Sequence, residues 1–295
     1  PSNTRGGIKF ENGNDRTASD AAYSFQRVLL QSDPNSGAWM MLEAIMGYSS
    51  GDVTEKIADG EYAGDQAALL ANASPEELKA VCEEVQSRFE ADDATGTFKV
   101  TLAQPWGPFL AIIARPWAYI IDQDWAIEQG DWDGTCDTWQ NFYAPGQEGT
   151  KLAKVIMGTG PYKLDHWTPG QEIVLTKFDG YWGEPAKLDR VTFKIIPEFG
   201  TRFAMLQAGD ADSIDVSVEN RPQVDPFVGV MRVYDPETNA YGDEVAVCAY
   251  DPNKLGQEAF TACGAGETGL DQPLRLYIGR PGLQQDVILF NFLIE

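Results

Sequence analysis

The stretch from Gly158 to Asp212 constrains the fold of this chain more than any other, because strand and turn signals alternate along it. Residues 162–167 alternate apolar and polar side chains, as a half-buried strand does. Residues 168–171, Thr-Pro-Gly-Gln, predict a turn, since Pro presets one dihedral angle and Gly accepts positive φ. Residues 173–175 then predict the second arm of a hairpin.

The second half of this stretch predicts a third strand and a short helix. Residues 191–196 alternate like a strand, and Pro197 ends it because proline has no amide hydrogen to donate. Residues 202–208 read as a helix that Gly209 stops. A small sheet followed by a helix is therefore the expected centre of the fold.

The same residues carry a resemblance to a known family. The motif GTGPY opens the stretch, WTPGQEIVL follows at 167–175, YWGEPAKLDRVTFKII occupies 181–196, and R-x-x-x-L-Q-A-G-D-x-D closes it at 202–212. In this order and spacing the series resembles the family 5 solute-binding proteins of ABC transporters, the peptide/nickel type.

The resemblance extends toward the N-terminus. The segment IKFENG at 8–13, followed by TASDAAYSFQR at 17–27, is similar to that family's opening pattern. Residues 98–102 and 105–110 resemble its central strand and the helix after it. Most of the chain is covered, apart from about residues 219–285.

The resemblance implies a mixed α/β (α+β) fold, the first lobe of a two-lobe periplasmic-binding-protein type II fold with the second lobe missing. Because the family's chains are much longer, we expect this chain to be a portion of a longer protein. Residues 1–150 should form a helix-rich subdomain and 151–295 a mixed-sheet core. A loop-rich excursion at about 219–286 should separate an outgoing strand at 213–218 from a returning strand at 287–291.

Helix signals in the first half of the chain support this division. Thr17 can cap a helix over 18–30, with an acidic residue in its first turn. Residues 39–48 form an apolar run of helical length. Ser74-Pro-Glu-Glu is a strong helix start, and that helix should reach about Phe89. A turn then leads into a strand at 97–102.

The net charge of −23 and the pI of about 4.3 exclude some classes of partner. Contacts to nucleic-acid phosphates need clustered Lys and Arg, so no nucleic-acid partner is expected. Docking on anionic lipid is disfavoured for the same reason. The first four residues show no signal-peptide pattern, and no apolar run is long enough to span a bilayer.

The chain has four cysteines and no C-x-x-C pair. Cys248 and Cys263 flank one loop-rich stretch with little core of its own, so we predict a disulfide between them. Cys82 and Cys136 are distant in sequence and fit either buried thiols or a second bridge. An even count fits the extracytoplasmic location, periplasmic or cell-surface anchored, that the resemblance implies.

Signals for catalysis, cofactors and metals are absent from the sequence. The single histidine, His166, lies on a strand of the hairpin, where an edge or surface position is expected. No P-loop, Rossmann glycine series or G-x-S-x-G elbow is present. We therefore expect no enzyme activity, no catalytic residues, no metal site and no cofactor.

Residues 104–143 are rich in aromatic side chains, which fit either a stacking wall for a ligand or ordinary core packing. Trp132 and Trp139 lie among Gly and Asp, so we predict that they are the exposed pair. The helical run from Trp39 to Tyr48 is a further candidate wall of the binding site.

The resemblance implies the solute-binding subunit of an ABC importer, which captures a peptide-like or oligosaccharide ligand in an interlobe cleft and delivers it to permease subunits in the membrane. By resemblance, the strands at the cleft contribute ligand contacts, here from Asp215, Ser217, Phe290 and Asn291. Two alternatives stay open: an acidic extracellular hydrolase using two carboxylates, and a surface structural protein that retained the fold.

Overall fold

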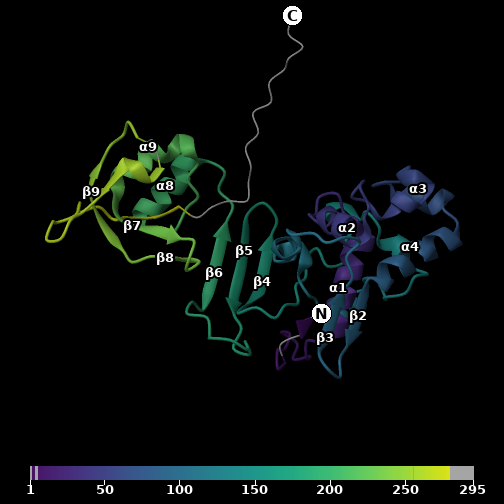
Figure 1. The fold of residues 1–295 in the computed structure, drawn as a ribbon. Helices are drawn as coiled ribbons and strands as arrows, with labels where there is room; N and C mark the ends of the chain where they lie inside the picture. Colours follow the sequence, from purple (N-terminus) through teal and green to yellow (C-terminus); the bar gives the residue numbers. More distant parts are fainter. Residues whose placement is uncertain (1, 4–5, 255, 280–295) are drawn as a thin grey trace, which may run out of the picture. The chain divides into compact units, whose positions relative to one another are not determined.

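The polypeptide divides between Ile195 and Ile196 into two units, each described here on its own (Figure 1). The computed structural model describes residues 2–3, 6–254 and 256–279. The predicted division at residue 150 remains a prediction, and the returning strand expected at 287–291 lies outside the described residues. Within the described residues, no helix has the length and apolar character needed to cross a membrane.

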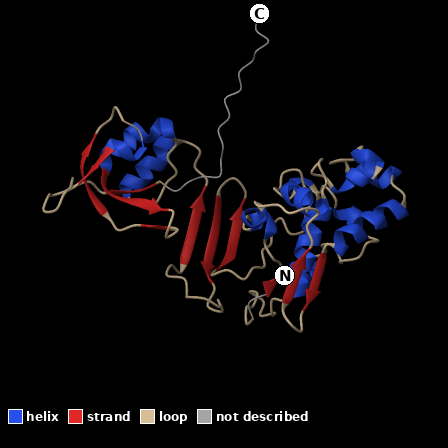
Figure 2. Cartoon of the chain, viewed as in Figure 1, coloured by secondary structure: helices blue, strands red, loops and turns tan. Residues whose placement is uncertain are grey.

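The first unit begins with a helical region, coloured purple to blue in Figure 1 and rich in helix in Figure 2. Its α-helices are α1 (Ala18–Gln31), α2 (Trp39–Met46), α3 (Gln66–Asn72), α4 (Pro75–Ser87), α5 (Phe109–Ile113), α6 (Gln123–Glu128) and α7 (Gly146–Gly149). Its 3₁₀ turns are η1 (Val53–Lys56), η2 (Ala58–Gly60), η3 (Pro116–Ala118) and η4 (Trp139–Phe142). A small antiparallel sheet of order β1-β3-β2 joins β1 (Ser2–Asn3), β3 (Thr97–Val100) and β2 (Phe89–Asp92).

The predicted starts of α1 and α4 are confirmed by their caps. The Asp20 amide donates to Thr17 Oγ1 at 3.1 Å, and the Thr17 amide donates to an Asp20 carboxylate oxygen at 2.7 Å. Ser74 and Glu77 form the same reciprocal box at the start of α4. Helix α4 ends at Ser87, short of the predicted end, because Phe89 begins β2 and pairs with Val100 of β3.

One core fills the helical region, with α1, α2 and α4 contributing much of it. A disulfide between Cys82 of α4 and Cys136 ties this core to the loop that precedes η4, with 5.4 Å between the Cα atoms. The second bridge, which the sequence left open, is therefore present. A buried ion pair lies at the edge of the core, where Arg27 Nε and Nη2 donate to the two carboxylate oxygens of Asp131 at 2.9 and 2.6 Å.

The hairpin and third strand predicted after Gly158 are confirmed. Strands β4 (Tyr162–Thr168), β5 (Glu172–Lys177) and β6 (Arg190–Lys194) form an antiparallel sheet of order β4-β5-β6. Gly170 adopts φ +72° in the turn between β4 and β5, a conformation that glycine accepts without strain. The loop that contains Tyr181 and Trp182 connects β5 to β6.

His166 lies on β4, an edge strand of this sheet, and is exposed as predicted. Its Nδ1 lies 2.9 Å from Asp165 Oδ2 and its Nε2 lies 3.3 Å from Glu172 Oε1. Hydrogen bonds to Asp165 and then to Glu172 raise the pKa of the imidazole.

Titration of His166 should therefore show a pKa above the usual value for histidine, measurable by NMR because the chain has a single imidazole. The substitution Asp165→Asn should lower this pKa, whereas Asp179→Asn, at an exposed aspartate beyond β5, should not change it. Because the folded-state pKa is raised, the pairing stabilises the fold at low pH and is lost as the pH rises through that pKa. An ordinary pKa in the intact protein contradicts this prediction.

The second unit starts with α8 (Phe199–Ala208), which Gly209 ends in a left-handed conformation as predicted. A five-stranded sheet follows, with order β10-β9-β7-β11 and β8 paired to β7. Its strands are β7 (Val228–Asp235), β8 (Ala240–Tyr241), β9 (Val245–Tyr250), β10 (Phe260–Ala262) and β11 (Leu274–Ile278). The remaining helical pieces are η5 (Val218–Asn220), α9 (Arg221–Val224), η6 (Asp225–Phe227) and η7 (Gly256–Ala259).

The excursion, expected to be rich in loops, carries strands β7 to β11 and has a small core of its own around Val228, Met231, Val247 and Phe260. Strand β11 pairs parallel to β7, and the other pairs in this sheet are antiparallel. The structure forms the disulfide between Cys248 of β9 and Cys263, just after β10, with 5.0 Å between the Cα atoms. The bridge fastens the β9–β10 pair at one end.

The prediction of an outgoing strand at 213–218 is wrong. Residues 211–217 form no strand, and Val218 begins η5. A strand requires a neighbour to complete its backbone hydrogen bonds. No described strand pairs with this segment, and its expected partner at 287–291 lies outside the described residues.

Candidate ligand-binding sites

The predicted cleft segment of the second unit is held in place by Arg202 of α8. Arg202 Nη1 donates to the carbonyl oxygens of Ile196 and Pro197 at 2.7 and 2.8 Å, and Nη2 donates to that of Asp215 at 3.4 Å. Glu198 caps the start of α8, and its carboxylate accepts the amides of Gly200 and Thr201. The segment around Asp215 has no regular secondary structure, but the hydrogen bond from Arg202 attaches it to α8.

Asp215 and Ser217 are both exposed on this segment. Ser217 Oγ accepts a hydrogen bond from Asn220 Nδ2 at 2.9 Å. Within the described part of the chain, the Asp215 carboxylate has no hydrogen-bond or ion-pair partner, so it is available to a ligand. Phe290 and Asn291, the other two residues predicted here, lie outside the described residues.

The two ends of the predicted binding wall, Trp39 and Tyr48, differ in exposure. Trp39 is exposed at the start of α2, so its ring is accessible. Tyr48 is buried and donates from its hydroxyl to Glu84 Oε2 at 2.9 Å. Burial, and then the neighbouring Glu84 carboxylate, raise the pKa of this hydroxyl, so Tyr48 is a structural residue.

The expectation that Trp132 and Trp139 are exposed is wrong, because both are buried in the core of the first unit. Trp132 stacks on Tyr23 and donates from Nε1 to the Thr135 carbonyl at 2.7 Å. Trp139 donates from Nε1 to the Leu78 carbonyl at 2.9 Å. The surrounding Gly and Asp residues belong to turns, and turn residues next to a tryptophan do not show whether its ring is exposed.

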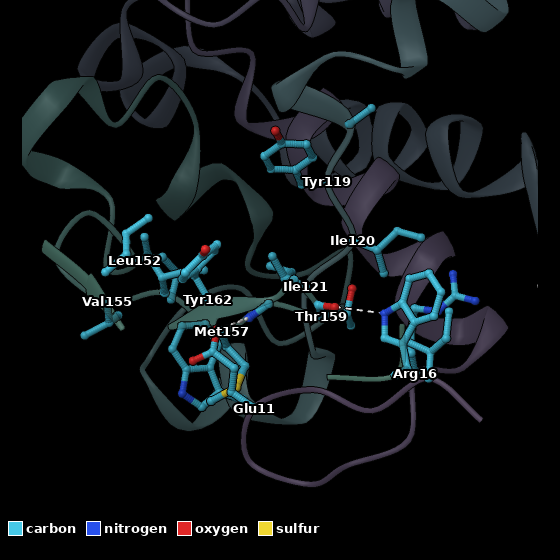
Figure 3. A pocket seen from close by; sticks show the side chains of 18 of the residues that line it. Glu11, Arg16, Tyr119, Ile120, Ile121, Leu152, Val155, Met157, Thr159 and Tyr162 are labelled. Atoms are coloured by element: carbon cyan, nitrogen blue, oxygen red, sulfur yellow. Dashed lines mark hydrogen bonds between the residues drawn. The ribbon is translucent and has the colours of Figure 1, made fainter. Parts of the chain in front are cut away.

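A pocket of about 900 Å³ lies in the first unit, close to the start of β4 (Figure 3). Its walls come from the N-terminal segment, from α1 and α6, from residues 118–121 and from residues 152–162, with Leu175 and Trp182 completing it. Most of the lining is apolar, and the aromatic rings are those of Tyr119, Trp125, Tyr162 and Trp182. A second pocket of about 290 Å³ shares part of this lining.

Several polar groups of the larger pocket make hydrogen bonds within the protein. The Gly158 amide donates to Glu11 Oε1 at 3.3 Å, and burial raises the pKa of the Glu11 carboxyl. Arg27 is held by Asp131 as described above, and Trp182 Nε1 donates to the Thr159 carbonyl at 2.9 Å. What remains open to a ligand is mostly hydrocarbon and aromatic surface.

The described residues contain one candidate group of metal-ligating side chains. The one group there that could hold a metal ion joins Cys248, Cys263 and Glu267, but the two sulfurs are bonded to each other and so are not thiolate ligands. Glu267 instead accepts the Gly264 amide at 2.6 Å.

Comparisons with known proteins give one family match and several similar sequences. The model of the bacterial extracellular solute-binding proteins, family 5, matches residues 4–244. The chain is 35% identical over 127 residues to the glutathione-binding protein GsiB of Escherichia coli (strain K12), covering 42% of this chain and 21% of GsiB. It is 25% identical over 221 residues to the dipeptide-binding protein DppE of Bacillus subtilis (strain 168), covering 75% of this chain and 32% of DppE.

A solved structure supports the fold. The structure of Burkholderia pseudomallei OppA aligns with a TM-score of 0.50 and 22% sequence identity, over 78% of this chain and 37% of that one. The mixed α/β chain therefore corresponds to about a third of an OppA-type binding protein. It spans between a fifth and a third of the length of the two curated relatives.

Proposed function

Because the chain belongs to family 5 of the bacterial extracellular solute-binding proteins, we propose that it is the first lobe of a solute-binding subunit that captures its ligand for an ABC importer. The family match over residues 4–244 carries the proposal. The family consists of non-enzymatic binding proteins, which removes the acidic hydrolase from consideration. The working location is outside the cytoplasm, and the partners are the permease subunits in the membrane.

The ligand is a short peptide. Two relatives are named for the peptides that they bind, glutathione and dipeptides, and this supports a peptide over an oligosaccharide. An exposed carboxylate without a partner suits the α-ammonium group of a peptide, because a charge-assisted hydrogen bond is stronger than a neutral one. Asp215 supplies that carboxylate, and Ser217 adds a hydroxyl close by.

Asn291 and Phe290 complete the proposed site from the returning segment. The Asn291 amide would hydrogen-bond the peptide backbone, and the Phe290 ring would contact an apolar side chain. Closure of a second lobe over the bound peptide would exclude water and strengthen these bonds.

The test begins with mass spectrometry of small molecules released from the full-length protein, followed by calorimetry with the ligand identified. Asp215→Ala should weaken binding by about tenfold to a hundredfold, the loss expected for one hydrogen bond to a charged group. Asn291→Ala should weaken it less. Asp243→Ala, which removes an exposed aspartate elsewhere in the second unit, should leave the affinity within twofold.

Different outcomes test the proposed site, the proposed function and the proposed ligand class. Unchanged affinity in both variants, with an intact circular-dichroism spectrum, removes the proposed site but leaves a binding protein. Steady chemical conversion of the ligand by the purified protein removes the binding function itself. Release of an oligosaccharide in place of a peptide corrects the ligand class.

A further inference from the structure

We propose that the Cys248–Cys263 bridge is the oxidised form of a zinc site, and that reduction by a dithiol makes its two sulfurs available as metal ligands. The two sulfur atoms and a carboxylate oxygen of Glu267 all lie within 4.8 Å of one another. After reduction, two thiolates and one carboxylate would therefore face a single point. The proposal stands on the second unit alone and does not depend on the proposed function.

The three side chains are of the types that Zn²⁺ binds. Zn²⁺ takes thiolate and carboxylate ligands, and three protein ligands leave a fourth tetrahedral position for water. Thiolates favour Zn²⁺ over Mg²⁺ and Ca²⁺, which prefer oxygen ligands. Within the described part of the chain, Glu267 is exposed and both cysteines are partly exposed, so the group is not enclosed in the core of the second unit.

A tight turn brings Glu267 back toward Cys263. The Glu267 amide donates to the Gly264 carbonyl at 3.1 Å, and Gly266 adopts φ +85°, which glycine accepts without strain. In the opposite direction, the Gly264 amide donates to Glu267 Oε2 at 2.6 Å, and the same oxygen lies 3.6 Å from Cys248 Sγ. The amide thus holds the carboxylate toward the sulfurs, and such outer-shell contacts strengthen metal sites.

Backbone hydrogen bonds hold the loop at 263–270 on β9 without help from the disulfide. The Cys263 amide donates to the Ala246 carbonyl at 2.9 Å, and the Leu270 amide donates to the Val247 carbonyl at 2.7 Å. These two bonds lie on either side of Glu267 in the sequence, next to Cys248 on β9. Reduction therefore breaks one covalent link but should leave the three ligand residues beside one another.

The step that opens the site is a thiol–disulfide exchange. A thiolate of the reductant attacks one cysteine sulfur, the Sγ–Sγ bond breaks, and the second thiol of the reductant completes the exchange. The reductant leaves as its own disulfide, having given two electrons and two protons, and Cys248 and Cys263 become thiols. Binding of Zn²⁺ then releases both thiol protons to the solvent.

The bridge of the first unit is the internal comparison. Cys82 is fully buried, whereas Cys248 and Cys263 are both partly exposed. Among the residues that the structure describes, no group of three metal ligands includes Cys82 or Cys136. A brief treatment of the folded protein with a dithiol should therefore reduce the Cys248–Cys263 bridge first, because exchange requires access to the sulfur.

The test uses the full-length protein, reduced under nitrogen with dithiothreitol and then freed of the reductant by gel filtration. Calorimetry should show that Zn²⁺ binds the reduced protein much more tightly than the oxidised protein. Glu267→Gln should weaken binding to the reduced protein by at least about tenfold, since loss of an outer-shell partner alone can cost that much. Glu258→Gln, at an exposed glutamate of η7, is the matched control and should leave the affinity unchanged.

Alkylation identifies the thiols that hold the ion and needs no variant. Zn²⁺ should protect Cys248 and Cys263 of the reduced protein from iodoacetamide, as read by peptide mass mapping. Equal Zn²⁺ affinity of the oxidised and reduced proteins overturns the proposal, and so does a Glu267→Gln variant that binds as tightly as the wild type. A bridge that resists the dithiol in the folded protein, or thiols that Zn²⁺ leaves unprotected, overturn it as well.

Discussion

Replacing Asp131 with alanine should lower the free energy of unfolding of the first unit by about 3–5 kcal/mol, because it leaves the largely buried Arg27 guanidinium without its partner. The Asp131 side chain is 1% exposed, and both of its oxygens accept hydrogen bonds from Arg27. Asp131 Oδ1 also accepts the Trp132 amide at 2.7 Å, so the same change disturbs the turn that folds this indole inward.

Urea unfolding followed by tryptophan fluorescence measures this effect selectively, since all eight tryptophans lie in the first unit. Asp15→Ala is the control, because its ion pair with Lys9 is exposed and should contribute about 1 kcal/mol or less. The double change Arg27→Met with Asp131→Leu should recover much of the loss, since it removes both charges together. A loss in Asp131→Ala as small as in Asp15→Ala contradicts the prediction.

Removing the Cys82–Cys136 bridge by a double substitution to alanine should cost about 4 kcal/mol in the chain-entropy model, since the bridge spans 54 residues. The Cys248–Cys263 bridge spans 15 residues, so the same model gives about 3 kcal/mol for its removal. The first loss should appear in tryptophan fluorescence and the second only in far-ultraviolet circular dichroism, because the second unit contains no tryptophan.

Each double variant is the control for the other. If both changes shift the fluorescence transition equally, then the two units unfold together and the assignment of one bridge to each unit is wrong. If neither change shifts any transition, then the bridges do not contribute the expected stability, and the prediction is wrong.

Local signals in the sequence predicted the local structure well. Thr17 and Ser74 marked helix starts because capping depends on residues three positions apart. The hairpin around Gly170 followed from turn chemistry in the same way. In each case the interacting residues are close together in the sequence, so a local sequence pattern is enough to predict their contacts.

The sites were harder to predict, because their residues meet only after folding. Trp132 and Trp139 carry no pattern that separates a buried ring from an exposed one, and their burial depends on Tyr23 and on the Leu78 carbonyl far away in sequence. The pocket joins Glu11 to Gly158 across most of the first unit. Tyr119 lies in the aromatic-rich stretch at 104–143, but nothing in the sequence linked it to the other residues of the pocket.

The parallel pairing of β11 with β7 has a consequence for how the second unit folds. Leu274 lies opposite Val228, so the chain must close a long loop before this ladder can form, and closure of long loops slows folding. Strands β9 and β10 lie between them in sequence and pair locally, and their bridge shortens the free chain that remains to be closed. Oxidation of Cys248 and Cys263 before β11 docks would thus lower the contact order of the last step in the folding of this unit.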